Sequence, residues 1–183
     1  RAPFFKQELK EFLLLTRDTG LDACRIKGSY AGAMGLPQFM PSSYRRLAVD
    51  FDNDGKRDLL DNPVDAIGSV AHYLQRHGWR AGAPVTGEVQ LRGTLYFWAE
   101  KLGLKPSLSV RQLADYGVFP RRRDDPERRA ALISLVGEDG PVYRLGYDNF
   151  YAITRYNLSK HYAMAVVELG ELIRQRMEEN PSS

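Results

Sequence analysis

The sequence predicts a mixed α+β fold in which helices predominate. Residues 4–17 carry apolar side chains at three- and four-residue spacings with charged residues between them, a pattern typical of an amphipathic helix. A second helix is predicted from Asn62, a capping residue that is followed by a proline at the first helical position. Two apolar runs, 131–136 and 142–145, are joined by a Gly-Glu-Asp-Gly turn and indicate a β-hairpin.

The other elements are shorter or less regular. The first helix is expected to end at Gly20 and the second at Gly78, since glycine commonly stops a helix. We further expect helices over 41–47, 94–101, 110–116 and 161–178, and a strand over 88–91. The chain therefore divides into a helical core region (1–78), a small α+β insertion (79–146) and a return to the core with a C-terminal helix (147–183).

The composition is that of a soluble globular protein. Of the 183 residues, 43% are hydrophobic and 27% charged. The net charge of +3 is too small to indicate nucleic-acid binding, but it is compatible with an anionic polymer. The arginine run 121–123 stands beside two aspartates, which favours a solvated loop. The lone Cys24 indicates a structural or exposed thiol rather than a reactive one, and no apolar run is long enough to span a membrane.

The stretch from Gly28 to Tyr44, GSYAGAMGLPQFMPSSY, fits neither an ordinary helix nor an ordinary strand. Its glycines allow close approach of the backbone to a ligand, its aromatic and methionine side chains supply an apolar wall, and Ser29 and Gln38 can aim hydrogen bonds. This composition predicts a binding cleft. A Gly/Pro connector that covers a core would have the same residue types, so that alternative stays open.

The segment from Asp50 to Asp61 follows the spacing of an EF-hand calcium loop. Its candidate ligands are the carboxylates of positions 1, 3, 5 and 9 and the carbonyl of position 7, namely Asp50, Asp52, Asp54, Asp58 and Lys56. Without a cation so many carboxylates would repel one another, although a plain Asp/Gly-rich turn is the alternative. An EF-hand closes with a glutamate at position 12, where this chain has the shorter Asp61. We expect Ca²⁺ in a structural role and no organic cofactor.

Three segments in this order resemble the B family of lytic murein transglycosylases. They are the stretch from Gly28 to Tyr44, then DFDNDGKRDLLDNPVDAIGSVAHYLQRHGW (50–79) and YAITRYNLSKHYAMAV (151–166). The resemblance implies a lysozyme-like helical core. It also implies a peptidoglycan lytic transglycosylase that cleaves the MurNAc-GlcNAc β-1,4 bond without water and leaves a 1,6-anhydromuramyl product.

The family resemblance implies one glutamate that performs both proton transfers, within a Glu-Ser/Thr-x-x-Gly signature upstream of the glycine-rich stretch. None of the ten glutamates of this chain has that context, and Glu8 and Glu11 are assigned to the polar face of the first helix. We therefore expect the catalytic glutamate upstream of Arg1. The alternative is a calcium-stabilised, non-catalytic peptidoglycan-binding module. A calcium sensor is disfavoured because there is no paired second loop.

The resemblance assigns the remaining positions to substrate and metal binding. Glycan contacts are implied for Ser29, Met34, Gln38, Phe39, Tyr73, Tyr156, Asn157 and Tyr162. The last calcium ligand is implied to be Asp65, at the start of the following helix, with Asp61 as the alternative. The implied partners are a peptidoglycan glycan strand, the N-terminal fragment of the same protein and other cell-wall enzymes, but no nucleic acid. The implied location is the periplasm, either free or held at the outer membrane by an upstream lipid anchor.

Overall fold

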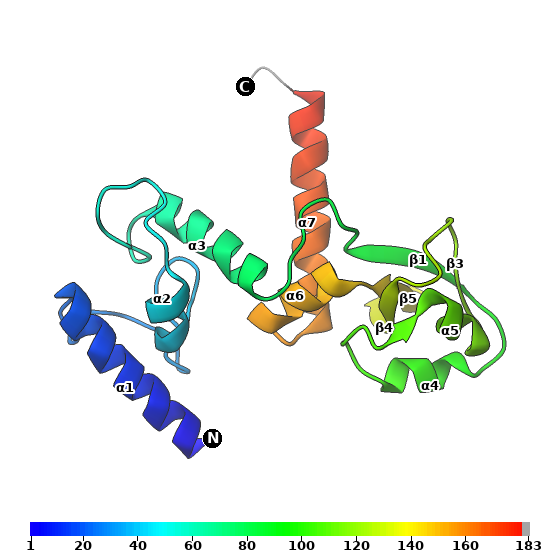
Figure 1. Cartoon of the computed structure of the whole chain (residues 1–183), viewed down its shortest axis with the longest axis horizontal. Helices are drawn as coiled ribbons and strands as arrows, with labels where there is room; N and C mark the ends of the chain where they lie inside the picture. The colour runs from blue at the N-terminus through cyan, green and yellow to red at the C-terminus, as the bar shows by residue number, and fades with distance from the viewer. Residues whose placement is uncertain (181–183) are drawn as a thin grey trace. The chain divides into compact units, whose positions relative to one another are not determined.

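A computed structural model describes residues 1–180 and divides the chain into two compact units, Arg1–Arg76 and the part that begins at His77 (Figure 1). Helices prevail and one unit contains a sheet, which confirms the predicted α+β class. The three-part division at residues 78 and 146 stays a prediction. Within the described residues, no helix combines the length and the apolar character that a membrane span requires.

The first unit consists of three helices and two long loops. Helix α1 (Ala2–Thr19) ends where predicted, because Gly20 takes the left-handed conformation with φ of 74°. Helix α2 (Pro41–Leu47) also has the predicted bounds, with proline at its first position. Helix α3 (Pro63–Arg76) follows the acidic loop, and Gly78, at φ of 97°, comes shortly after its end.

The packing of α1 differs from the sequence-based prediction. Phe5, Leu9 and Leu13 are exposed in the described structure, whereas Glu8, which was assigned to the polar face, is only 8% exposed. The reason is positional: α2 begins opposite Glu8, and its carboxylate accepts hydrogen bonds from the backbone N–H (3.0 Å) and hydroxyl (2.8 Å) of Ser42. The free N–H groups of a helix N-terminus favour an anionic acceptor over a leucine or phenylalanine.

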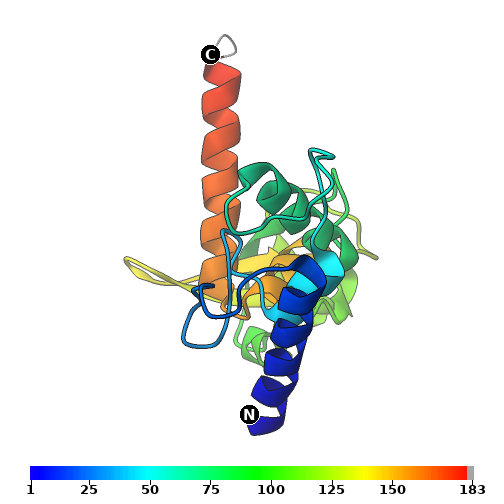
Figure 2. The same cartoon turned by 90° about the vertical axis from the view of Figure 1, so that its left-hand side faces the viewer.

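The second unit is built on a five-stranded antiparallel sheet in the order β2-β4-β5-β1-β3. The strands are β1 (Thr86–Leu91), β2 (Leu108–Ser109), β3 (Val118–Pro120), β4 (Arg129–Gly137) and β5 (Gly140–Gly146). The register of β4 and β5, from Ala131↔Gly146 to Gly137↔Gly140, confirms the predicted hairpin. Figure 2 shows the tip of this hairpin extending away from the rest of the unit. The short strands β2 and β3 were not predicted from the sequence.

The four helices of this unit are α4 (Tyr96–Lys101), α5 (Val110–Asp115), α6 (Asp148–Tyr156) and α7 (Lys160–Glu179). All but α6 were predicted. Asn149 is buried at the start of α6, where its amide donates to the carbonyls of Arg80 and Ala83 and accepts the N–H of Arg80. This helix therefore anchors the loop that leads into the sheet. The main core of the unit consists of Val89, Ala99, Val110, Leu113, Val118, Ala130, Leu132, Leu145 and Tyr147.

Candidate functional site

The glycine-rich stretch folds into two successive tight turns that share one residue. Met34 forms antiparallel bridges both with Gly28 and with Phe39. Its N–H donates to the carbonyl of Phe39 at 2.9 Å, and the N–H of Phe39 returns the bond at 3.0 Å. The Met34 side chain is 2% exposed and Phe39 is equally buried. These two residues therefore fasten the stretch to the core of the first unit.

Two backbone positions in this stretch have positive φ for identifiable reasons. Gly35, at φ of 71°, lies against the carbonyl oxygen of Leu59, and a Cβ at this position would overlap that oxygen. Gln38, at φ of 52°, is exposed, and its amide donates to the carbonyl of Gly35 at 2.9 Å. Glycine permits the first of these conformations without cost, whereas the second strains a residue that bears a side chain. The turn therefore presents Gln38 to solvent on a constrained backbone.

A cavity of about 330 Å³ lies between α1 and the glycine-rich stretch. Its apolar lining includes Phe5, Phe12 and Met34, and its polar lining includes Ser29 and Glu8. The Ser29 hydroxyl accepts the N–H of Ala33 at 3.0 Å, so its position is set by the turn. The cavity combines an apolar wall with a few fixed polar groups, which is the composition of a ligand site.

The predicted contact residues of the first unit occupy different depths. Ser29 and Gln38 are exposed, whereas Met34, Phe39 and Tyr73 are buried. The rings of Phe39 and Tyr73 pack with their centroids 5.4 Å apart. In this structure, therefore, the buried residues support the loop from below, and the two polar residues lie at its surface.

Three predicted contact residues belong to the second unit, at the junction of α6 and α7. The rings of Tyr156 and Tyr162 are parallel, with an interplanar angle of 1° and centroids 6.4 Å apart. Asn157 caps the end of α6 and is exposed, and its side-chain oxygen accepts the N–H of Ser159 at 3.0 Å. Tyr162 is also exposed. Together they form a small aromatic and amide surface, a combination that suits the faces and edges of a sugar ring.

The acidic loop between α2 and α3 gathers three carboxylates. Oxygens of Asp50, Asp52 and Asp65 lie within 4.8 Å of one another. Asp65 is fully buried and receives the N–H groups of Phe51 and Asp58, each at 2.8 Å. Carboxylates of mixed burial at this separation, with oxygen as the only donor type, fit a hard cation such as Ca²⁺.

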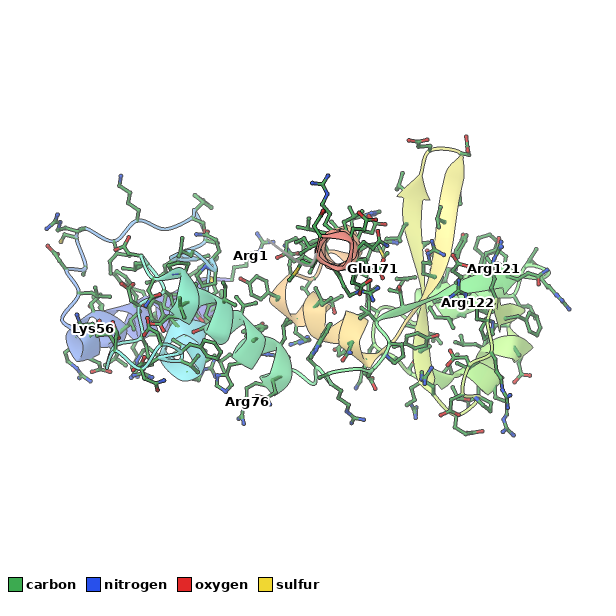
Figure 3. The ribbon with its side chains drawn as sticks, turned by 90° about the horizontal axis from the view of Figure 1, so that it is seen from above. Arg1, Lys56, Arg76, Arg121, Arg122 and Glu171 are labelled. Carbon is green, nitrogen blue, oxygen red and sulfur yellow. The ribbon has the colours of Figure 1, made fainter. Side chains whose placement is uncertain are left out.

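The other predicted ligands bond within the loop itself. The carboxylate of Asp54 accepts the N–H of Lys56, whose position Figure 3 labels, at 2.8 Å. The carboxylate of Asp58 accepts the N–H groups of Leu60 and Asp61. Asp61 is exposed and is not among the three gathered carboxylates, whereas Asp65 is. Of the two alternatives for the closing ligand, only Asp65 therefore lies near Asp50 and Asp52, and its binding of a cation stays a prediction.

Tyr44 and Ser69, which the sequence did not single out, hold the loop against its flanking helices. The Tyr44 hydroxyl donates to the carbonyl of Arg57 and accepts the N–H of Leu59, both at 2.9 Å. Burial raises the pKa of this hydroxyl. The Ser69 hydroxyl accepts the N–H of Val49 at 2.9 Å. A hydrogen bond from Asn62 lowers the pKa of Asp52 at the loop surface.

Glu8 lines the cavity although it was predicted to lie on the polar face of α1, and the sequence contained a signal for its true position. It lies three residues after Phe5 and four before Phe12, so the helical period puts it on their face rather than on the polar one. Tyr44 and Ser69 gave no comparable signal. Their partners are backbone groups 13 to 20 residues away, and such pairs follow from loop geometry rather than from periodicity.

The chain is similar in sequence and structure to proteins described as lytic transglycosylases. Residues 1–171 match the family described as transglycosylase SLT domain. The membrane-bound lytic murein transglycosylase B of Escherichia coli K12 is 47% identical over 173 residues, which are 94% of this chain and 46% of that protein. A structure of the catenated lytic transglycosylase SltB1 from Pseudomonas aeruginosa is 46% identical with a TM-score of 0.90, and the match covers 96% of this chain and 58% of that one.

Two further structures were solved with ligands. One is the E. coli lytic transglycosylase Slt35 in complex with calcium, at 46% identity and a TM-score of 0.84, covering 96% of this chain and 55% of that one. The other is SltB3 from P. aeruginosa in complex with NAG-anhNAM-pentapeptide, at 39% identity and a TM-score of 0.75, covering 91% and 45%. The chain thus spans about half the length of these relatives.

Proposed function

Because this chain belongs to the family of transglycosylase SLT domains, we propose that it forms the glycan-contacting part of a peptidoglycan lytic transglycosylase. The reaction is cleavage of the MurNAc-GlcNAc β-1,4 bond without water, and its product is a 1,6-anhydromuramyl end. The observation that carries the proposal is the cavity beside the glycine-rich stretch, where Ser29 and Met34 meet the apolar residues of α1. A site of this size and composition suits a sugar ring.

The contact residues have two proposed roles. Ser29, Gln38 and Asn157, which are exposed, hydrogen-bond to hydroxyl and acetamido groups of the glycan. Tyr156 and Tyr162 offer ring faces for the apolar side of a pyranose. The second role is support: Met34, Phe39 and Tyr73 hold the loop in place from beneath.

The proton chemistry is proposed to come from a glutamate upstream of Arg1. In such a reaction one carboxyl protonates the glycosidic oxygen and then accepts the proton of the C6 hydroxyl of the same muramic acid, so that no water is consumed. Glu8 lines the cavity, but both of its oxygens already accept hydrogen bonds from Ser42. Its role here is to join α1 to α2.

Calcium is proposed as a structural ion of the acidic loop. Asp50, Asp52 and Asp65 supply carboxylates, and Asp54, Asp58 and the carbonyl of Lys56 complete the ligand set. The related Slt35 has been solved with calcium. The proposed ion fixes the connection between α2 and α3, and it supplies no catalytic water, since calcium acidifies water far less than zinc does.

We propose that the substrate carries peptides and that the protein acts on it in the periplasm. The related SltB3 was crystallised with a disaccharide that bears a pentapeptide, and the E. coli relative is described as membrane-bound. The proposed setting is accordingly a glycan strand with peptide stems, at or near a membrane. The N-terminal fragment of the same protein and other cell-wall enzymes are the proposed protein partners.

The test is mass spectrometry of the fragments that the full-length protein releases from purified peptidoglycan. We expect 1,6-anhydromuramyl ends, at least tenfold fewer with Gln38→Ala, and no change with Gln90→Ala, an exposed glutamine on β1. The 183-residue chain alone should bind glycan without cleaving it. Anhydro products from that chain alone would refute the upstream glutamate, and binding without cleavage by the full-length protein would identify a non-catalytic module.

A further inference from the structure

A second cavity, of about 640 Å³, lies within the second unit. It is bordered by β1, the segment after β3, β5 and α7. Five arginines and three carboxylates line it, so its lining carries a net positive charge. Figure 3 labels Arg122 beside the strands and Glu171 on α7, two of the lining residues. None of the glycan-contact residues proposed above belongs to this cavity.

Most of these charges already have partners. Arg144 pairs with Glu88 at 3.2 Å, Arg128 pairs with Asp124, and Arg174 pairs with Glu178 at 3.4 Å. In residues 1–180, Arg122 and Arg123 form neither a hydrogen bond nor an ion pair with the protein. The arginine run that the composition assigned to a solvated loop is indeed exposed, but two of its members border a cavity.

Two residues of the cavity lining, Tyr147 and Asp124, have buried side chains that are hydrogen-bonded to each other. Tyr147 is 5% exposed and donates its hydroxyl proton to Asp124, whose side chain is also almost completely buried. Burial raises the pKa of Tyr147, so the hydroxyl keeps this proton and remains a donor. Gly87 lies directly over the hydroxyl, and any Cβ there would overlap it. The guanidinium of Arg128 stacks on the Tyr147 ring at 5.5 Å.

We propose that this cavity binds a free carboxylate of the peptide stem on the glycan strand, through the guanidinium groups of Arg122 and Arg123. This proposal rests on the proposed function, which supplies a peptide-bearing substrate. Guanidinium groups bind carboxylates through paired N–H donors, and two such groups with no competing partner are available here. Pro84, Pro120 and Met164 give the cavity apolar walls that suit the hydrocarbon part of a peptide.

The remaining carboxylate of the lining favours a peptide over an inorganic oxyanion. Glu171 makes no ion pair within residues 1–180 and lines the same cavity as the two free arginines. The two arginines would attract a phosphate as well as a carboxylate, but only a ligand that also carries a free amine gains an ion pair with Glu171. The site therefore selects a ligand with both a carboxylate and an ammonium group. Because Arg122 and Arg123 are exposed, binding weakens as salt is added.

The test is calorimetric titration of the full-length protein with a free stem pentapeptide, the peptide length of the disaccharide ligand in the SltB3 complex. The double variant Arg122→Gln/Arg123→Gln should weaken binding at least tenfold, and amidation of the peptide carboxylates should do the same. The matched control Arg111→Gln/Arg176→Gln removes the same charge from exposed positions outside the cavity and should stay within twofold. Unchanged affinity in the first double variant would overturn the proposal. Equally tight binding of inorganic phosphate would overturn the choice of a peptide.

Cleavage assays separate this proposal from the proposed function. Peptide-free glycan should be cleaved equally by the wild type and by both double variants, whereas peptide-bearing glycan should be cleaved less efficiently, through a higher KM, only by Arg122→Gln/Arg123→Gln. Equal KM values of the wild type and Arg122→Gln/Arg123→Gln on peptide-bearing glycan would refute the peptide site but would leave the proposed function untouched. Absence of anhydro products from the wild type on either substrate would instead refute the proposed function, whatever the peptide affinity.

Discussion

The carboxylate of Glu8 in α1 accepts both the backbone N–H and the hydroxyl proton of Ser42 at the N-terminus of α2, across 34 residues of sequence. This contact joins the helix that forms one wall of the candidate cleft to the helix that follows the glycine-rich stretch. The same two helices are joined a second time where Arg45 of α2 bonds to Glu11 and to Asp18. The geometry of the cleft thus depends on polar contacts between α1 and α2.

Replacement of Glu8 by alanine should destabilise the protein by about 1–3 kcal/mol, because the Ser42 donors lose their buried acceptor. Chemical denaturation followed by circular dichroism measures the change. Gln7→Ala is the control, since the Gln7 side chain bonds only on the exposed surface, and it should cost less than about 0.5 kcal/mol. Equal stabilities of the two variants would contradict the role assigned to Glu8.

Gly35→Ala should be among the most damaging single substitutions in the first unit. The added methyl group meets the carbonyl oxygen of Leu59 and also occupies a left-handed conformation, so we expect a loss of more than about 3 kcal/mol. Gly32→Ala is the matched control, because Gly32 also has a positive φ, of 90°, but open space surrounds the added atom. This substitution should lower the free energy of unfolding by about 1–2 kcal/mol. Thermal unfolding ranks the two, and the reverse order would refute the argument from the Leu59 carbonyl.

The Tyr44 hydroxyl should contribute to stability through its two backbone partners at the end of the acidic loop. Tyr44→Phe leaves the Leu59 N–H without its acceptor, at a cost of about 1–3 kcal/mol. Tyr30→Phe removes a hydroxyl from a fully exposed ring and should have no measurable effect. Urea unfolding of both variants tests this, and a neutral Tyr44→Phe would show that water satisfies the freed backbone groups.

Calcium should raise the melting temperature, because an ion that binds only the folded chain stabilises it by about 2.7 kcal/mol at 100 times the Kd. Chelation should reverse the shift. Asp52→Asn should abolish most of it, while Asp61→Asn should leave it intact, since only Asp52 belongs to the gathered carboxylates. Scanning calorimetry with and without calcium provides the measurement. A loss confined to Asp61→Asn would reinstate Asp61 as the closing ligand.

The Glu11–Arg45 ion pair should make the free energy of unfolding depend on pH. The hydrogen bond from Arg45 lowers the pKa of the Glu11 carboxyl below its ordinary value of 4.5. A carboxyl whose pKa is lower in the folded state stabilises the fold above its unfolded pKa, and this contribution is lost as the pH falls through the lowered value. Glu11→Gln should therefore be less stable than the wild type at pH 7, with a difference that shrinks toward pH 3. A constant difference across that range would exclude this linkage.

The regular elements of the fold were predictable from the sequence, and the contacts between them were predictable only in part. The start of α2 follows from Pro41, and the end of α1 follows from Gly20, because both residues act on their own backbone. Helix α6 was missed although its apolar residues recur at helical spacing, and the bond from its Asn149 to a loop some 66 residues away was not predictable. No local pattern reports a partner at that distance.

The sequence by itself determined the family, the acidic loop with its spacing of candidate ligands, and the residue types of the candidate cleft. Each of these depends only on residues that are consecutive in the chain. Tertiary structure decided the burial of each residue. Met34, Phe39 and Tyr73 are buried beneath the loop, while Ser29 and Gln38 are exposed. It also decided that Asp65 rather than Asp61 joins Asp50 and Asp52. The physical reason is common to both outcomes, because burial and mutual distance depend on how the helices pack, and packing joins residues that the chain keeps apart.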